Sequence, residues 1–221
     1  TTGGSILRQP PNENPHMQAL TTAAAHPQHR HRHRSLLTEY PYTYNNCNVS
    51  STIETPPTKV ITMNQGTTEI MLAMQLTDHM IGTAYLDDEI WPLYQQPYDT
   101  IPVISSTYPT MEQLEELQPD FLYGSYSSAF SNSSIDYPTL LFGNGTTEQC
   151  ALVTERNDVY RAYCRPELQE YGIDTFLQTA LCELIEHRPE NQTVESTLFE
   201  EIKTIGQIFN ATDQAELVMA D

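Results

Sequence analysis

The amino-acid sequence predicts an α/β fold, a three-layer lobe in which helices flank a mainly parallel sheet. The main observation is a regular alternation, from Lys59 to Gly124, of short apolar runs with segments of helical pattern. Such alternation is typical of βαβ units, whose strands are parallel. A second observation is that capping residues such as Thr110 and Gly172 stand where the expected helices begin and end.

Each expected strand is a short apolar run, often β-branched, bounded by polar or turn-forming residues. In chain order these runs are residues 59–64, 80–85, 101–104, 120–123 and 173–177, with a weaker candidate at 139–142. Ligands bind parallel sheets beyond the carboxyl ends of the strands. The residues that follow each strand are therefore the first candidates for function.

The expected helices carry sequence signals at their ends. In chain order they are residues 67–76, 111–117, 165–171 and 198–209, followed by a helix that starts at Thr212. Thr110 and Gln113 have the spacing of a capping box. Gly66 is the expected N-cap of the first helix, with Glu69 at its N3 position, and Gly172 is expected to end the third.

The first 57 residues have the composition of a disordered, low-complexity tail. They include a tract of alternating His and Arg from His26 to Arg34. Its imidazoles could bind a divalent metal, but the interleaved arginines oppose a cation, which favours a solvated arm. The expected lobe occupies residues 58–192, and residues 193–221 are expected to be helical.

Acidic side chains dominate the chain after the tail. The formal net charge is −19 at pH 7, and residues 59–221 hold 26 acidic but only six basic side chains. A surface of this charge repels phosphate backbones, so nucleic acid is not an expected partner. No apolar run approaches the ~20 residues that a membrane-spanning helix requires, so the chain is not expected to span a membrane.

Sequons and cysteines predict a secreted, extracellular glycoprotein with disulfides. The acceptor asparagines of the five Asn-x-Ser/Thr sequons are Asn48, Asn132, Asn144, Asn191 and Asn210. The four cysteines are Cys47, Cys150, Cys164 and Cys182. A bridge between Cys150 and Cys164 would close a short polar loop, but the pairing is open, and four buried thiols are the alternative.

Several segments of the lobe follow one another in an order and spacing that a known family shares. They are the runs Val60 to Leu76, Ile81 to Tyr85, Ile101 to Ile104, Gly172 to Phe176 and Leu198 to Val218. The most specific segment, Tyr108 to Tyr123, has proline, a small polar residue, a hydrophobic residue and Glu, followed by Leu-Gln-Pro-Asp. Together they resemble the amino-terminal lobe of the ABC-importer substrate-binding proteins for iron–siderophores, haem, cobalamin and metals.

The resemblance, which covers residues 59–221, implies two α/β lobes that are joined by one rigid helix and close on a ligand. Residues 193–221 would lead into the inter-lobe helix, and the second lobe would be absent from this sequence. The implied ligand-binding residues follow the strands: Asn64, Gln65, Gly66 and Thr67, then Tyr85, Asp87 and Asp88, then Tyr108, and finally Tyr126, Ser127 and Ser128.

The chemistry of these residues is compatible with ligand binding. Backbone N–H groups at a helix start favour anionic ligand groups, and tyrosine offers a flat apolar face with a polar tip. Each position also has an ordinary explanation. Thr67 can cap a helix, Tyr85 and Tyr108 can be packing residues, and Asp87 and Asp88 can form a solvated turn.

The function implied by the resemblance is non-catalytic, extracellular binding of a metal chelate, with an iron–siderophore as the best single expectation. The alternatives are cobalamin or haem bound by the same fold, and a secreted glycoprotein that interacts with proteins and takes no small molecule. An axial haem ligand such as His79 would precede a strand, at the wrong end of the sheet. A bare metal ion is not expected, because the lobe offers only His79 and His187 as imidazole ligands.

Glu112 is a separate candidate. The resemblance implies a glutamate here that pairs with arginines of a membrane permease, which in this chain would be a docking vestige. The stripe of Met111, Leu114 and Leu117 independently directs Glu112 toward solvent, near a helix start that favours negative charge. The expected partners are thus a small-molecule chelate and a membrane transporter or receptor, and the complete protein is expected to be a monomer.

Enzymatic motifs are not found in the sequence. It has no Gly-x-Ser-x-Gly elbow, no phosphate-binding glycine loop and no His-Glu-x-x-His pair. The prediction is a protein that is not an enzyme, with no cofactor and no catalytic residue.

Overall fold

The structure is a computed structural model that describes residues 37–47, 49–130, 163–182 and 193–220, with only the backbone at residues 127, 181 and 182. The chain divides into two units, residues 1–34 and 35–221, and the described residues belong to the second. The expected tail up to residue 36 and the candidate strand at 139–142 lie outside the described residues. So do Asn48, Asn132, Asn144, Cys150, His187 and Asn191.

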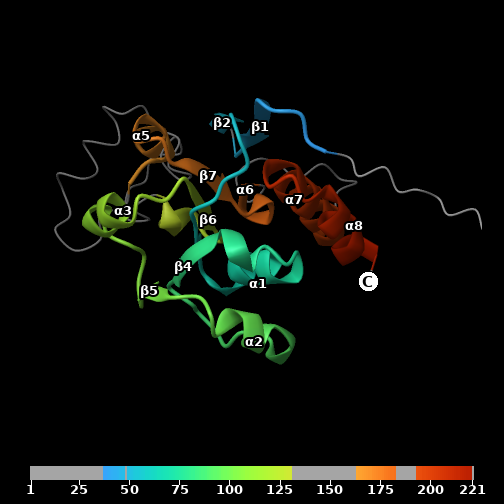
Figure 1. The fold of residues 1–221 in the computed structure, drawn as a ribbon, viewed down its shortest axis with the longest axis horizontal. Coiled ribbons are helices and arrows are strands. Elements are labelled where there is room, and N and C mark those ends of the chain that lie inside the picture. The colour runs from blue at the N-terminus through green and yellow to red at the C-terminus, as the bar shows by residue number, and fades with distance from the viewer. Residues whose placement is uncertain (1–36, 48, 131–162, 183–192, 221) are drawn as a thin grey trace, which may run out of the picture. The chain divides into compact units, whose positions relative to one another are not determined.

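A five-stranded parallel sheet forms the centre of the described lobe, which confirms the predicted α/β fold. Its strands are β3 (Val60–Met63), β4 (Met80–Ala84), β5 (Val103–Ser105), β6 (Phe121–Gly124) and β7 (Asp174–Leu177). They lie in the order β5-β4-β3-β6-β7 (Figure 1). All five expected strands are present, and their bounds differ from the expected ones by only one or two residues.

Helices cover both faces of the sheet, as expected for three layers (Figure 1). The longer ones are α1 (Gln65–Ala73), α3 (Met111–Leu117), α5 (Arg165–Glu170), α7 (Val194–Ile208) and α8 (Thr212–Ala220). Short helical segments are Thr77–His79, Pro92–Tyr94, α2 (Gln95–Tyr98), Ser127–Ala129 and α6 (Thr179–Cys182).

Successive strand residues are buried in two separate apolar cores, because both faces of a parallel sheet are covered. Val60, Phe121 and Phe176 pack in the core that also holds residues of α1, α7 and α8. Ile61 and Leu122 pack in the other core, with residues of α3 and α5. The sheet is thus held rigid from both sides.

The helix ends confirm one capping prediction and correct another. Thr110 and Gln113 form the expected capping box at the start of α3. Gly66 is not the N-cap of α1, because the helix begins two residues earlier than expected, at Gln65, with Asn64 as the N-cap. Gly172 has φ 75°, the left-handed conformation that ends many helices, and stands one residue after the C-cap of α5.

Residues 42–53, which were expected to belong to the tail, instead form an antiparallel pair of strands. The strands are β1 (Tyr42–Asn46) and β2 (Val49–Ile53). The Tyr44 hydroxyl donates to the Thr175 carbonyl at 3.0 Å. Tyr44 and Ile53 are buried in the core that also holds residues of α1, α7 and α8. The pattern was missed because one inward position of β2 is Ser51, so its apolar alternation is incomplete. The folded lobe therefore begins well before residue 58.

Arg165 fastens this strand pair to the sheet although no carboxylate binds it in the described contacts. Its guanidinium donates to the Asn46 carbonyl and side chain at 3.0 and 2.9 Å, and to the Thr175 hydroxyl and carbonyl at 2.8 and 3.1 Å. The Asn46 side chain in turn exchanges hydrogen bonds with the backbone N–H and carbonyl of Leu177. Burial lowers the pKa of Arg165 to about 10.

Cys47 and Cys164, the cysteines whose side chains the structure describes, are disulfide-bonded and not free thiols. They directly follow Asn46 and precede Arg165, the residues that join the strand pair to α5 and β7. Which cysteine each one pairs with stays a prediction.

Candidate functional site

The strand order places a topological switch point between β3 and β6. From β3 the chain proceeds outward to β4 and β5, and then returns to the other side of β3 to form β6 and β7. The connections on the two sides of the switch point diverge, which leaves the carboxyl ends of β3 and β6 accessible to a ligand. The residues predicted to bind a ligand follow these strands and β4 and β5.

Asn64 links the carboxyl ends of β3 and β4. Its backbone N–H donates to Ala84 at 3.0 Å, and its side-chain amide donates to the Tyr85 carbonyl at 3.2 Å. Its φ of 77° and ψ of 163° belong to a region that only glycine adopts readily, at a cost of about 1–3 kcal/mol. Tyr85 also has a positive φ, 48°. Backbone strain of this kind concentrates at functional sites.

Tyr108 joins the turns after three strands. Its hydroxyl donates to the Asn64 side-chain oxygen at 3.3 Å and lies 2.9 Å from the Ser128 hydroxyl. Its ring meets that of Tyr85 edge to face, with centroids 4.7 Å apart. Burial raises the pKa of the Tyr108 hydroxyl, which therefore acts as a neutral hydrogen-bonding group.

Asp87 binds the amino terminus of α1. One carboxylate oxygen accepts from the backbone N–H of Gln65 at 3.0 Å, and the other accepts from the Tyr126 hydroxyl at 2.9 Å. This hydrogen bond raises the pKa of the Tyr126 hydroxyl. The expectation that this helix start attracts an anionic ligand group needs correction, because an acidic side chain of the protein already occupies it.

The segment after β4 is tied back to α1 by further hydrogen bonds. The Gln65 side chain donates to the Glu89 carbonyl and to the Glu69 carboxylate, both at 2.8 Å. The same carboxylate accepts from the backbone N–H of Trp91 at 2.7 Å. Asp87 is therefore held by its own hydrogen bonds and by those that tie Glu89 and Trp91, just after it in the chain, to α1.

Seven of the predicted residues form two neighbouring hydrogen-bonded sets, joined through the chain at Asn64 and Gln65, which together we call the strand-end cluster. Its members are Asn64, Gln65, Tyr85, Asp87, Tyr108, Tyr126 and Ser128. The rings of Tyr85 and Tyr126 are 39% and 45% exposed, so a ligand can reach them.

The other predicted residues have different positions. Thr67 is fully buried, and its hydroxyl donates to the carbonyls of Met63 and Tyr123 at 2.8 and 3.2 Å, which is a structural role. Asp88 is exposed, and its carboxylate accepts from the adjacent N–H of Glu89, as in a solvated turn. Gly66 is half-buried in the first turn of α1, and Ser127 lies in the short helix after β6.

Two residues beside the site were not predicted. Ser125, directly after β6, accepts from the backbone N–H of Thr67 at 3.3 Å. A Cβ atom added at Gly66 would lie 3.3 Å from the Ser125 hydroxyl and 3.6 Å from the Gln178 amide oxygen. Gln178 follows β7, so the strand-end rule would have found it had the rule been extended to the fifth strand.

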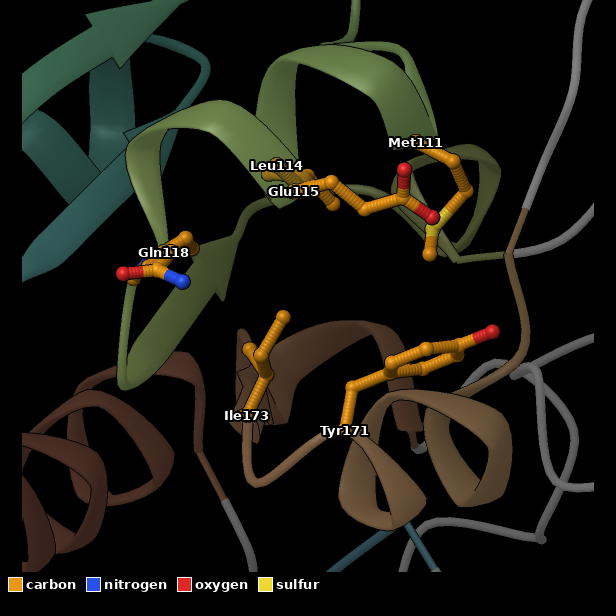
Figure 2. Close-up of a pocket in the computed structure, with 7 residues that line it drawn as sticks. Met111, Leu114, Glu115, Gln118, Tyr171 and Ile173 are labelled. Carbon is orange, nitrogen blue, oxygen red and sulfur yellow. The ribbon is translucent and has the colours of Figure 1, made fainter.

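A cavity of about 360 Å³ lies near the amino ends of the strands, on the side of the sheet opposite the strand-end cluster. Figure 2 shows Met111, Leu114, Glu115 and Gln118 of the α3 region facing Tyr171 and Ile173 across it. Its lining residues precede β6 and β7, so it is separate from the strand-end cluster. His79 also precedes a strand, and its Nδ1 lies 2.7 Å from the Pro57 carbonyl oxygen.

The described ranges contain no group of three or more His, Cys, Asp or Glu side chains placed to hold a metal ion. None of the helices in these ranges combines the length and the apolar character that spanning a bilayer requires.

Comparisons with known proteins support the fold. No protein-family profile matches the chain, and no curated protein matches it. The chain matches a periplasmic binding protein from Veillonella parvula with a TM-score of 0.59 and 24% identity, over 81% of this chain and 49% of that one. It matches an ABC-type Fe3+-hydroxamate transport protein from Saccharomonospora viridis with a TM-score of 0.54 and 20% identity, over 82% and 53%.

A third similar structure is the siderophore-binding protein BauB, solved with ferric iron and two molecules of acinetobactin. Its TM-score is 0.50 and its identity 14%, over 81% of this chain and 50% of that one. The chain thus spans about half the length of these proteins. The likeness shows that the described residues have the fold of a periplasmic binding protein, as the sequence resemblance implied.

Proposed function

We propose that this chain is a non-catalytic substrate-binding protein that holds a metal chelate, most readily a ferric siderophore, at the strand-end cluster. The observation that carries the proposal is the gathering of Tyr85, Tyr108 and Tyr126 beside the topological switch point, where Tyr108 packs on Tyr85 and binds Asn64, and Tyr126 binds Asp87. The three similar structures support a binding role, since each is a binding or transport protein.

The chemistry of the cluster favours a preformed chelate over a bare ion. The raised pKa values of Tyr108 and Tyr126 oppose the loss of a proton that direct metal coordination by a phenol requires. As neutral groups, both hydroxyls can hydrogen-bond to the oxygen atoms of a chelate, while exposed ring faces pack on its apolar parts. Cobalamin and haem are the alternative ligands of the same surface.

The wider features of the protein are part of the same proposal. Because the chain spans about half of the similar structures, a second lobe would complete the site in the full protein. A membrane transporter or receptor would receive the loaded protein, and Glu112, which is exposed on α3, would be the vestige of that contact. Secretion is supported by disulfide-bonded Cys47 and Cys164 and by the exposed sequon residue Asn210.

The test uses Trp91, the single tryptophan of the sequence, which is 62% exposed and hydrogen-bonded through its backbone to Glu69 beside the cluster. Titration with a ferric trihydroxamate, a ferric catecholate, haem and cobalamin should quench its fluorescence with at least one of them. Free N-acetyltryptophanamide corrects for light absorption by the chelate. The full 221-residue chain is used throughout.

Matched variants identify the site. Tyr108→Phe keeps the ring but removes the hydroxyl that contacts Asn64 and Ser128. It should weaken chelate binding by about fivefold, the effect of losing one hydrogen bond to the ligand. The control Tyr171→Phe makes the same change at a more exposed tyrosine, 59% exposed, beside the cavity at the amino ends of the strands, and should leave binding unchanged. If no chelate quenches Trp91, the interaction-module alternative gains, since exposed Trp91 and Leu93 would then suit a protein partner.

A further inference from the structure

We propose that the strand-end cluster selects chelates by charge, and that it binds a cationic group of the ligand, such as a pendant ammonium, at Asp87. This inference rests on the proposed function. It adds to it that anionic chelates are disfavoured and that ligands of positive charge are preferred.

The first argument is the occupancy of the helix start. An anion would normally find free N–H groups at the amino terminus of α1. Here Gln65 donates to Asp87, Thr67 donates to Ser125, and Thr68 donates to the Asn64 carbonyl at 3.4 Å, which leaves only the N–H of Gly66 among the first four without a described acceptor. An anionic ligand that reached this helix start would lie beside the Asp87 carboxylate, which the helix end already stabilises. The site therefore presents the negative charge of Asp87 to any ligand that binds there.

The second argument is the distribution of charge around the cluster in the described residues. The acidic side chains of Asp87, Asp88 and Glu89 are all exposed there. The Lys and Arg side chains of the described ranges are elsewhere. Lys59 precedes β3 at the opposite edge, Arg165 is fully buried, and Lys203 is on α7. No described cation is thus available to neutralise a carboxylate or catecholate ligand at this edge.

The third argument is the combination of a carboxylate with aromatic faces. Asp87 lies close to Tyr108 and Tyr126, and Tyr85 lies close to both tyrosines, since each pair interacts electrostatically. A carboxylate has about four lone-pair directions, of which Gln65 and Tyr126 use two. The remaining directions and the tyrosine faces together suit an ammonium group, which ring quadrupoles attract.

The experiment compares two chelates that share one metal centre but differ in charge. The first is the ferric complex of desferrioxamine B, a linear trihydroxamate that ends in a free ammonium group. The second is the ferric complex of its N-succinyl derivative, which ends in a carboxylate. Dissociation constants come from Trp91 quenching and from calorimetry with the full chain, at low and at physiological salt.

We expect the ammonium chelate to bind about tenfold more tightly, the combined effect of an exposed ion pair and a cation–π contact. Asp87→Asn is nearly isosteric and should reduce this preference to about twofold or less. The control Glu116→Gln removes the same charge from an exposed position of α3 and should keep the tenfold preference. Higher salt should reduce the preference of the wild-type protein.

Each outcome decides between the two proposals. If neither chelate binds but another chelate of the Trp91 titration does, the proposed function stands and this inference fails; if no chelate binds at all, both fail. If both bind equally, or the succinyl derivative binds more tightly, the proposed function stands and charge selection is wrong. If the preference persists in Asp87→Asn, Asp87 is not its source. Circular dichroism and the melting temperature of Asp87→Asn establish that the variant is folded.

Discussion

The two edges of the same parallel sheet differ in how they use polar side chains. At the amino ends, the Asp120 carboxylate accepts from the backbone N–H groups of Thr58 and Lys59 at 2.7 and 2.8 Å, so it serves the backbone. At the carboxyl ends, the strand-end cluster combines such backbone contacts, made by Asn64 and Asp87, with side chain–side chain bonds of Tyr108 and Tyr126, on a backbone strained at Asn64. The described cavity lies at the amino ends, so the proposed binding site and the cavity are on opposite sides of the sheet.

The largest expected effect concerns Arg165, which holds β1 and β2 against β7. Arg165→Met should reduce the free energy of unfolding by about 3–5 kcal/mol, because it removes four buried hydrogen bonds from the guanidinium to Asn46 and Thr175. Urea unfolding measures the loss. Lys203→Met, at an exposed position of α7, is the control and should change stability by less than about 0.5 kcal/mol. A loss below 1 kcal/mol for Arg165→Met would mean that the strand pair does not depend on this contact.

The next effect is the pH dependence of stability, which two acids with raised pKa values cause: Glu201 near the carboxyl ends of the strands and Asp174 near the amino ends. Glu201 of α7 accepts from the Tyr123 hydroxyl and from the backbone N–H of Thr179, which follows β7. Burial raises its pKa from 4.5 to about 7. Because the folded-state pKa is above the unfolded one, the protonated acid is favoured in the fold. The stability it contributes is complete below about pH 4.5 and is lost as the pH rises to 7.

Glu201→Gln imitates the protonated acid and should remove this dependence. The variant should match the wild type near pH 4.5 and exceed it by about 3 kcal/mol at pH 8, from the size of the pKa shift. Asp174, at the start of β7, has a pKa raised to about 6, chiefly by burial. Asp174→Asn should act in the same direction, over a lower pH range and more weakly, since this carboxyl is only partly buried. Equal stability curves for Glu201→Gln and wild type would contradict the burial of a charged Glu201.

A smaller effect tests the backbone strain at Asn64, at the carboxyl ends of the strands. Asn64→Ala should be less stable than Asn64→Gly by about 1–3 kcal/mol, because glycine adopts the φ and ψ of this position without strain. At the amino edge, Gln118 has the milder left-handed values φ 49° and ψ 57°. The difference between Gln118→Ala and Gln118→Gly should be only about 1 kcal/mol. Equal differences at both positions would remove the contrast in strain between the edges.

The order of strands and helices could be predicted from the sequence because each is short, apolar and clearly bounded. The candidate site residues came from the family resemblance, and their positions after the strands agree with the strand-end rule. The role of Asp87 could not be predicted, since it depends on how the segment after β4 returns to the start of α1. The strands at residues 42–53 were missed because Ser51 interrupts their apolar pattern, and because the buried partners of Tyr44 and Asn46 are ~130 residues away in sequence.

The smallest expected effect concerns Glu112, which is exposed in the first turn of α3, as the helical pattern predicted. Near the helix start its charge is favourable by ~0.3–1 kcal/mol, which by itself explains a glutamate at this position. Glu112→Ala should therefore lower stability by no more than about 1 kcal/mol and leave chelate affinity at the opposite edge unchanged. Thermal unfolding and Trp91 quenching measure the two quantities. Glu115→Ala, beside the cavity on the same helix, is the matched variant. A stability loss above about 2 kcal/mol at Glu112 would show that it has a partner within the protein, and it could not then be a vestige of a docking contact.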